Sequence, residues 1–107
     1  MIEELSWFRV GVGVPRTVVA DVAANVASLV DLAGEAAAQD CDLVVFPELC
    51  LTAYTCGELF QQRTLLNAAR EGLTTFAHRS AELDAVFVVG LPLAVDGRLY
   101  NVAAVVQ

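Results

Sequence analysis

The sequence D-L-V-V-F-P-E-L-C-L-T-A-Y at residues 42–54 is the most informative part of this chain for its architecture. Its first part, Asp42 to Phe46, contains a short continuous apolar run, which is typical of a strand covered on both faces. Pro47 lacks the backbone N–H that a ladder needs, so we expect the strand to stop there. The strand therefore delivers Glu48 to its carboxyl end.

Upstream of this stretch, the sequence predicts a strand followed by a helix. Residues Phe8 to Val14 alternate large and small side chains and end at the breaker Pro15. From Asp21, a candidate N-cap, apolar residues recur at three- and four-residue steps up to an expected end near Gln39 or Asp40. The apolar positions of this helix are Val22, Val26, Leu29, Ala33 and Ala36.

Downstream, the sequence predicts a turn, a second helix and two more strands. Thr52 to Gly57 is polar and turn-like, and an amphipathic stripe follows it. Ala85 to Leu91 is a buried strand, and Asp96-Gly97 is a strong hairpin signal before a strand from Leu99 to Val106. The stripe of the second helix consists of Leu65, Leu66, Ala69, Leu73, Phe76 and Ala77.

The expected order of elements is thus β-α-β-α-β-β. Strands that alternate with helices imply right-handed crossovers and a mostly parallel sheet, in which the hairpin reverses direction at one side. The fold class is α/β. The last apolar strand, Ala103 to Val106, stops at Gln107 without a turn or polar tail, so we expect the chain to be truncated.

Composition excludes several classes of function. The chain has 107 residues and is 57% hydrophobic, yet no window approaches the roughly 18 uninterrupted apolar residues of a membrane helix. The formal net charge of −7 argues against nucleic-acid binding, which requires clustered lysines and arginines. The opening segment, Met1 to Trp7, has two acids and no basic residue, unlike a signal peptide, so we expect a cytoplasmic protein.

The three cysteines carry no metal-binding or catalytic signature. Cys41, Cys50 and Cys56 are odd in number and lack metal-type spacing, and His78 lies far downstream of them. Reduced thiols and no metal site are therefore expected, and a Cys–His nucleophile using His78 lacks the local sequence that such pairs carry. Gly11 and Gly13 begin a G-x-G without a third glycine, so a dinucleotide-binding loop is not expected either.

Glu48 is the candidate catalytic residue. Ligands of an open α/β sheet bind at the carboxyl ends of its strands, where Glu48 is expected to lie. Burial beside Phe46 and Leu49 would raise the pKa of its carboxyl group and suit it to proton transfer. From position alone, the alternative that Glu48 caps the next turn or pairs with an arginine stays open.

The motif around Glu48 resembles a known family. F-P-E-L followed by L-T-A-Y resembles the F-P-E-x-x-L-T-G-Y segment of the nitrilase superfamily of carbon–nitrogen hydrolases, with Ala53 in place of the usual glycine. This resemblance implies a partial nitrilase-type α-β-β-α sandwich. It also implies that Glu48 is the base of a Glu-Lys-Cys triad.

A longer stretch, F-P-E-L-C-L-T-A-Y-T-C-G-E-L-F-Q-Q from residue 46, is similar to the glutaminase domain of bacterial glutamine-dependent NAD synthetases. Glu58 stands where aspartate is usual. By this resemblance, residues 1–107 are the N-terminal portion of such a domain. Its substrate is glutamine, and the ammonia serves an ATP-using synthetase domain that converts deamido-NAD to NAD, in a homo-oligomer.

The resemblance assigns only part of the triad to this chain. The family lysine and cysteine lie beyond the position matching Gln107, and the sequence contains no lysine, so we expect the chain alone to be inactive. Cys50 and Cys56 are not equivalent to the family nucleophile. Tyr54 matches a family tyrosine near the glutaminase site and is a candidate substrate-binding residue, although packing under the loop would also explain it.

Two other interpretations stay open. A free-standing amidase of the same superfamily would share the motif, and a non-catalytic α/β binding module would use Glu48 only structurally. Asn101, in L-Y-N-V-A, is common in the family too, but a side-chain amide that bonds the hairpin backbone would explain it.

Overall fold

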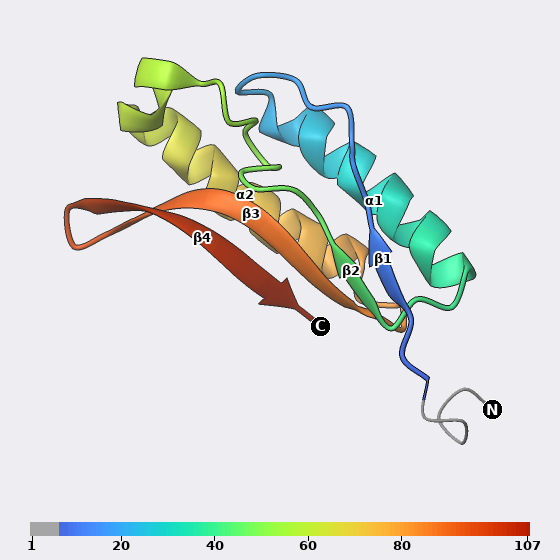
Figure 1. Cartoon of the computed structure of the whole chain (residues 1–107). Helices are drawn as coiled ribbons and strands as arrows, with labels where there is room; N and C mark the ends of the chain where they lie inside the picture. The colour runs from blue at the N-terminus through green and yellow to red at the C-terminus, as the bar shows by residue number, and fades with distance from the viewer. Residues whose placement is uncertain (1–6) are drawn as a thin grey trace.

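The computed structural model describes residues 7–107 and contains one sheet packed against two helices (Figure 1). Its elements are β1 (Val10–Val12), α1 (Val22–Ala38), β2 (Leu43–Val45), the 3₁₀ helix η1 (Gly57–Gln61), α2 (Arg63–Arg79), β3 (Val86–Val95) and β4 (Arg98–Val106). The expected β-α-β-α-β-β order is confirmed, and η1 is the one addition. Met1 to Ser6, most of the segment interpreted above as unlike a signal peptide, lie outside the described residues.

The sheet has four strands in the order β1-β2-β3-β4. Strands β1, β2 and β3 are parallel, and β4 is antiparallel to β3. The hairpin that joins β3 to β4 turns at Asp96 and Gly97, whose φ angles are 50° and 77°. Positive φ at both central residues matches the twist of the flanking strands, which is why the Asp-Gly pair was a sound hairpin signal.

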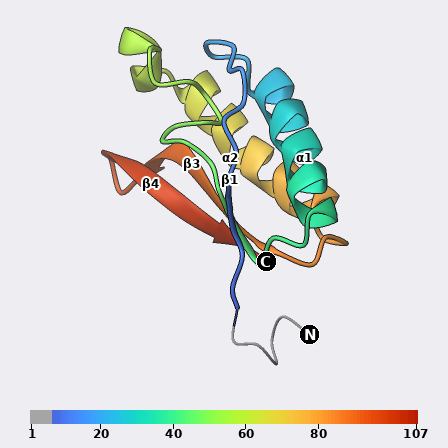
Figure 2. The ribbon, with the colours of Figure 1, turned by 45° about the vertical axis from the view of Figure 1, so that its right-hand side comes forward.

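Both helices cover the same face of the sheet, as Figures 1 and 2 show. α1 begins where expected, because the Asp21 carboxylate accepts the Ala24 N–H at 3.1 Å. The core between helices and sheet centres on Phe46, Phe76 and Phe87, whose ring centroids lie 5.6–6.4 Å apart. These rings fix the end of β2 against α2 and β3.

The two helices approach closely at Gly72 of α2. A Cβ atom at this position would meet Val22 Cγ1 at 2.5 Å and Val26 Cγ2 at 3.2 Å, both on α1. Any other residue here would force the valine side chains of α1, or one of the helices, to shift. None of the helices in residues 7–107 is long and apolar enough to cross a membrane.

The opposite face of the sheet, here called the open face, carries a row of valines. Val12, Val45, Val88 and Val105 lie in register across the four strands. The outer two are 75% and 70% exposed, respectively. Residues 7–107 thus form one helical layer and one sheet layer of the expected sandwich, with an apolar sheet face uncovered.

Candidate active site at the carboxyl end of strand β2

The loop after β2 buries its apolar residues and exposes Glu48. Leu49, Cys50 and Leu51 lie in the core, whereas Glu48 is exposed. The expectation that Phe46 and Leu49 desolvate the carboxylate is wrong for this chain, because both side chains are buried in the core while the Glu48 side chain is not. The loop therefore packs its apolar side chains into the core and presents one carboxylate to the outside.

Glu48 lines a hollow on the open face of the sheet. The hollow measures ≈ 320 Å³ and is walled by β2, β3 and β4. Among the described residues around it, Glu48 is the only ionisable side chain, and Asn101 is the only other polar one. Its lining residues are Val45, Phe46, Pro47, Glu48, Val88, Val89, Gly90, Asn101, Val102 and Ala103. A carboxylate beside an amide on an apolar floor suits acid–base work on a small polar substrate.

Asn101 lines the Glu48 hollow, although a hydrogen bond to the hairpin backbone was one explanation that its sequence position offered. It lies opposite Pro92 in the β3–β4 ladder, and its side chain makes no hydrogen bond within residues 7–107. The amide is therefore open to a ligand, not used by the hairpin backbone. The available signal was the period-2 alternation of β4, which places residue 101 on the same face as the exposed Val105.

Asn25 of α1 braces the Glu48 loop from the helical side. Its side-chain amide is 1% exposed and donates to Leu51 O at 3.0 Å and to Val18 O at 2.9 Å. Its carbonyl oxygen accepts the Val18 N–H at 2.7 Å. One buried amide therefore joins two loops that lie far apart in the sequence.

Tyr54 does not share the hollow with Glu48. Its side chain is 72% exposed, so it is not packed under the loop, and it is absent from the lining of the Glu48 hollow. The hydroxyl makes no hydrogen bond within residues 7–107. The substrate-binding role of Tyr54 stays a prediction.

The cysteines are buried. Burial raises the pKa of the Cys50 thiol above its ordinary value of 9.0, and a hydrogen bond from the Gly90 backbone partly opposes this. Cys56 donates to Thr52 O at 3.0 Å, and Cys41 lies in the core. His78 is exposed in the last turn of α2. A Cys–His nucleophile with an exposed His78 therefore has no geometric support.

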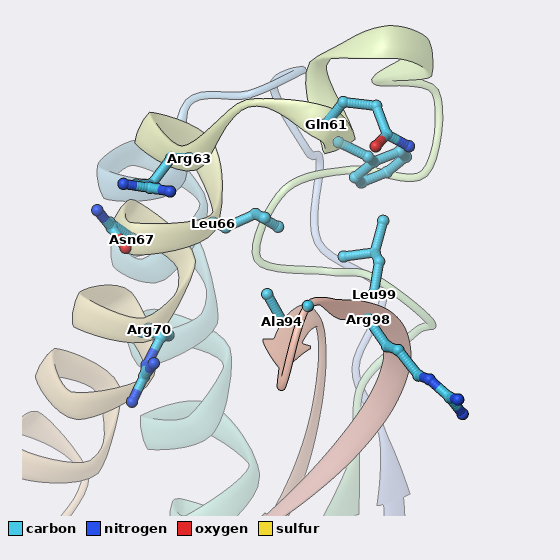
Figure 3. A pocket seen from close by; sticks show the side chains of 10 residues that line it. Gln61, Arg63, Leu66, Asn67, Arg70, Ala94, Arg98 and Leu99 are labelled. Atoms are coloured by element: carbon cyan, nitrogen blue, oxygen red, sulfur yellow. The ribbon is translucent and has the colours of Figure 1, made fainter.

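A second hollow of similar size, ≈ 330 Å³, lies between α2, η1 and the β3–β4 hairpin (Figure 3). Leu66 projects from α2 toward the hairpin, while the Arg98 guanidinium turns away from the hollow. Three arginines line its rim, and the described residues around it include no acid. Size therefore does not distinguish the two hollows, and only the one at Glu48 offers a base.

Comparison with known proteins gives a consistent picture. The family model described as carbon–nitrogen hydrolase matches residues 9–107. Glutamine-dependent NAD(+) synthetases of Mycobacterium bovis and Mycobacterium tuberculosis are each 39% identical over 99 residues, which is 92% of this chain. The one from Mycobacterium leprae is 33% identical over 89 residues. The chain spans 15% of the length of the first two relatives.

Solved structures agree on the fold. A glutamine-dependent NAD(+) synthetase from Cytophaga hutchinsonii matches 94% of this chain and 17% of its own with a TM-score of 0.87 and 28% identity. The enzyme from Acinetobacter baumannii matches the same share of this chain and 19% of its own, with a TM-score of 0.79 and 27% identity. An amidase from Nesterenkonia, at 22% identity and a TM-score of 0.71, covers 92% of this chain and 37% of its own and shares the fold.

Proposed function

The chain belongs to the carbon–nitrogen hydrolase family, and from that premise we propose that it carries the general base of a glutamine-hydrolysing domain. Its relatives are named for glutamine-dependent NAD synthesis, which supports glutamine as the substrate. The ammonia released would convert deamido-NAD to NAD at an ATP-using synthetase domain of the same homo-oligomeric protein. ATP would bind outside residues 1–107.

The observation that carries this proposal is the position of Glu48. Within residues 7–107 it is the only ionisable side chain that lines the hollow at the carboxyl end of β2, and a buried loop holds it. A carboxylate in this position can take a proton from a thiol brought to the same hollow. The free amide of Asn101 lies in the same hollow and can bind the polar end of a substrate.

The proposed reaction proceeds in two acyl-transfer steps. Glu48 takes the proton of a cysteine thiol, and the thiolate attacks the side-chain amide carbon of glutamine. A lysine stabilises the tetrahedral oxyanion, and the leaving nitrogen takes the proton from Glu48 and departs as ammonia. Water, deprotonated by Glu48, then hydrolyses the thioester and releases glutamate. This sequence has no lysine, so the triad needs residues from elsewhere in the protein.

The test is the Glu48→Gln substitution in the whole enzyme. We expect ammonia release from glutamine to fall about 10³-fold, because a general base is lost without a change in shape. NAD synthesis from added ammonia persists, since that reaction needs no glutamine hydrolysis. Glu58→Gln is the matched control: Glu58 is exposed on η1, outside the hollow, and this variant keeps both activities. Equal loss of both activities in Glu48→Gln, or no loss, would contradict the assignment.

A further inference from the structure

The loop that carries Glu48 leaves the sheet between two bonds to β3. The Phe46 N–H donates to Val88 O at 3.0 Å, and the next such bond runs from the Leu51 N–H to Gly90 O at 3.1 Å. In a regular parallel ladder, the amide two residues after Phe46 would bond Gly90 O, and that amide belongs to Glu48. The bond comes three residues later, so Glu48 lies at the start of a short excursion out of the sheet.

Gly90 lies directly beneath this excursion. A Cβ atom at residue 90 would meet Leu49 N at 2.5 Å, Pro47 O at 3.0 Å and Glu48 C at 3.1 Å. All three are backbone atoms, so no side chain could turn aside to make room. Any residue other than glycine here would displace the peptide that carries Glu48.

Cys50, near the end of the excursion, is hydrogen-bonded to the backbone of Gly90. Its thiol is 1% exposed, accepts the Gly90 N–H at 3.3 Å and donates to Gly90 O at 3.7 Å. The neighbouring Leu49 has a φ of 52°, a conformation that a residue with a side chain keeps only when its surroundings hold it there. A neutral thiol can donate and accept at once, and burial keeps the thiol neutral.

We propose that Gly90 and Cys50 form an anchor that positions the Glu48 carboxylate for proton transfer. Cys50 is outside the lining of the Glu48 hollow, and Gly90, which lines it, has no side chain to offer a substrate. Gly90 lets the peptide of Glu48 lie against β3, and the Cys50 thiol fixes the far end of the excursion to the same point of the strand. The inference rests on the proposed function, because it assigns a purpose to the placement of a general base.

The test compares Cys50→Ala with Cys50→Ser in the whole enzyme, measuring glutamine-dependent ammonia release well below the unfolding temperature of each variant. A reacting group displaced by about 1 Å loses about 10²-fold in rate, so we expect kcat of Cys50→Ala to fall about 10- to 100-fold. KM should stay within about twofold, because ground-state binding is untouched. Cys50→Ser, whose hydroxyl also donates and accepts, should recover kcat to within about threefold of the native enzyme.

Two matched controls separate positioning from general damage. Cys41→Ala removes another buried thiol from the core, away from the Glu48 loop, and should leave kcat unchanged. Gly90→Ala should lower kcat at least as much as Cys50→Ala. Gly34→Ala should not lower kcat, because a Cβ at this helix position meets nothing within 4 Å. If Gly90→Ala fails to fold, the comparison of Cys50→Ala with Cys50→Ser still tests the proposal.

A Cys50→Ala enzyme that loses thermal stability yet keeps native kcat would overturn the anchor, and so would a Cys50→Ser enzyme as slow as Cys50→Ala. The Glu48→Gln enzyme distinguishes this failure from that of the proposed function. If Glu48→Gln is active, the proposed function is wrong. If Glu48→Gln is inactive while Cys50→Ala keeps full activity, only the anchor is wrong.

Discussion

Cys50 is a residue whose ionisation couples to the stability of the fold. Its thiol lies in the core with both hydrogen-bond roles filled by Gly90, and burial raises its pKa. The protonated form is therefore the form that the folded state holds. A thiolate in the same place would have only the backbone N–H groups of Gly90 and of Cys50 itself as donors in place of water.

This coupling predicts a loss of stability at alkaline pH. Below the ordinary thiol pKa of 9.0, both the folded and the unfolded states hold the proton, and the contribution of the neutral Cys50 thiol to stability is fully present. As the pH rises above this value, the unfolded chain loses the proton first, so the free energy of unfolding falls by up to about 1.4 kcal/mol per pH unit. Cys50→Ser does not titrate there, so its denaturant unfolding curves should show a shallower decline between pH 9 and 10.5. Parallel declines would contradict the prediction.

At the scale of single residues, the sequence was informative about Glu48 and silent about its supports. Glu48 follows a buried apolar run and a proline, both of which are local patterns. Gly90 packs against a loop about 40 residues upstream, and Asn101 lines the same hollow as Glu48; no local pattern reports such long-range neighbours. The exposure of the Glu48 carboxylate was mispredicted for the same reason, since the apolar type of a neighbour does not tell which way that neighbour points.

The helices and strands match their sequence patterns except at the end of β3, whose length depends on the strands beside it. The strand expected to end at Leu91 continues through Pro92 to Val95. β3 pairs with β2 only from Val86 to Val88, and farther along it has β4 alone as a neighbour. A proline is tolerated there because its missing N–H faces no strand on the other side. Which strands lie beside one another is a property of the sheet, and the sequence of one strand does not contain it.

Two glycines in the helices predict opposite effects of the same substitution. Gly34→Ala in α1 should raise the free energy of unfolding by about 0.5–1 kcal/mol, because alanine favours the helix and its Cβ meets nothing within 4 Å. Gly72→Ala in α2 should lower it by about 1–3 kcal/mol despite the same helix preference, because the methyl group collides with Val22 of α1. Chemical denaturation of both variants checks the pair. Stabilisation by both would mean that the helices do not meet at Gly72.

For the molecule as a whole, the open face predicts association. Its row of valines runs across all four strands, and the outer two are largely exposed. We expect residues 1–107 expressed alone to self-associate with rising concentration in sedimentation experiments, because exposed apolar sheet faces and strand edges bind one another. A monomer with sharp cooperative unfolding would contradict this.

A pair of double variants tests whether the open face is responsible. Replacing Val12 and Val105 with lysine should shift the polypeptide toward monomer, because two charges interrupt the row. Replacing Val19 and Val95 with lysine makes the same change in net charge at exposed valines outside the row and should leave association unchanged. Equal effects of both variants would assign the association to net charge.

The strand order also bears on how the protein is made. Within residues 7–107, each strand after β1 lies beside the strand that precedes it in the chain, so this part of the sheet can form in the order in which a ribosome delivers its residues. The two parallel pairings join residues 33 and 43 positions apart, Val10 with Leu43 and Leu43 with Val86, and closing crossovers of this length is slow. Gly90 lies beneath the Glu48 loop once β3 has paired with β2, so we expect this loop to reach its geometry before β4 pairs.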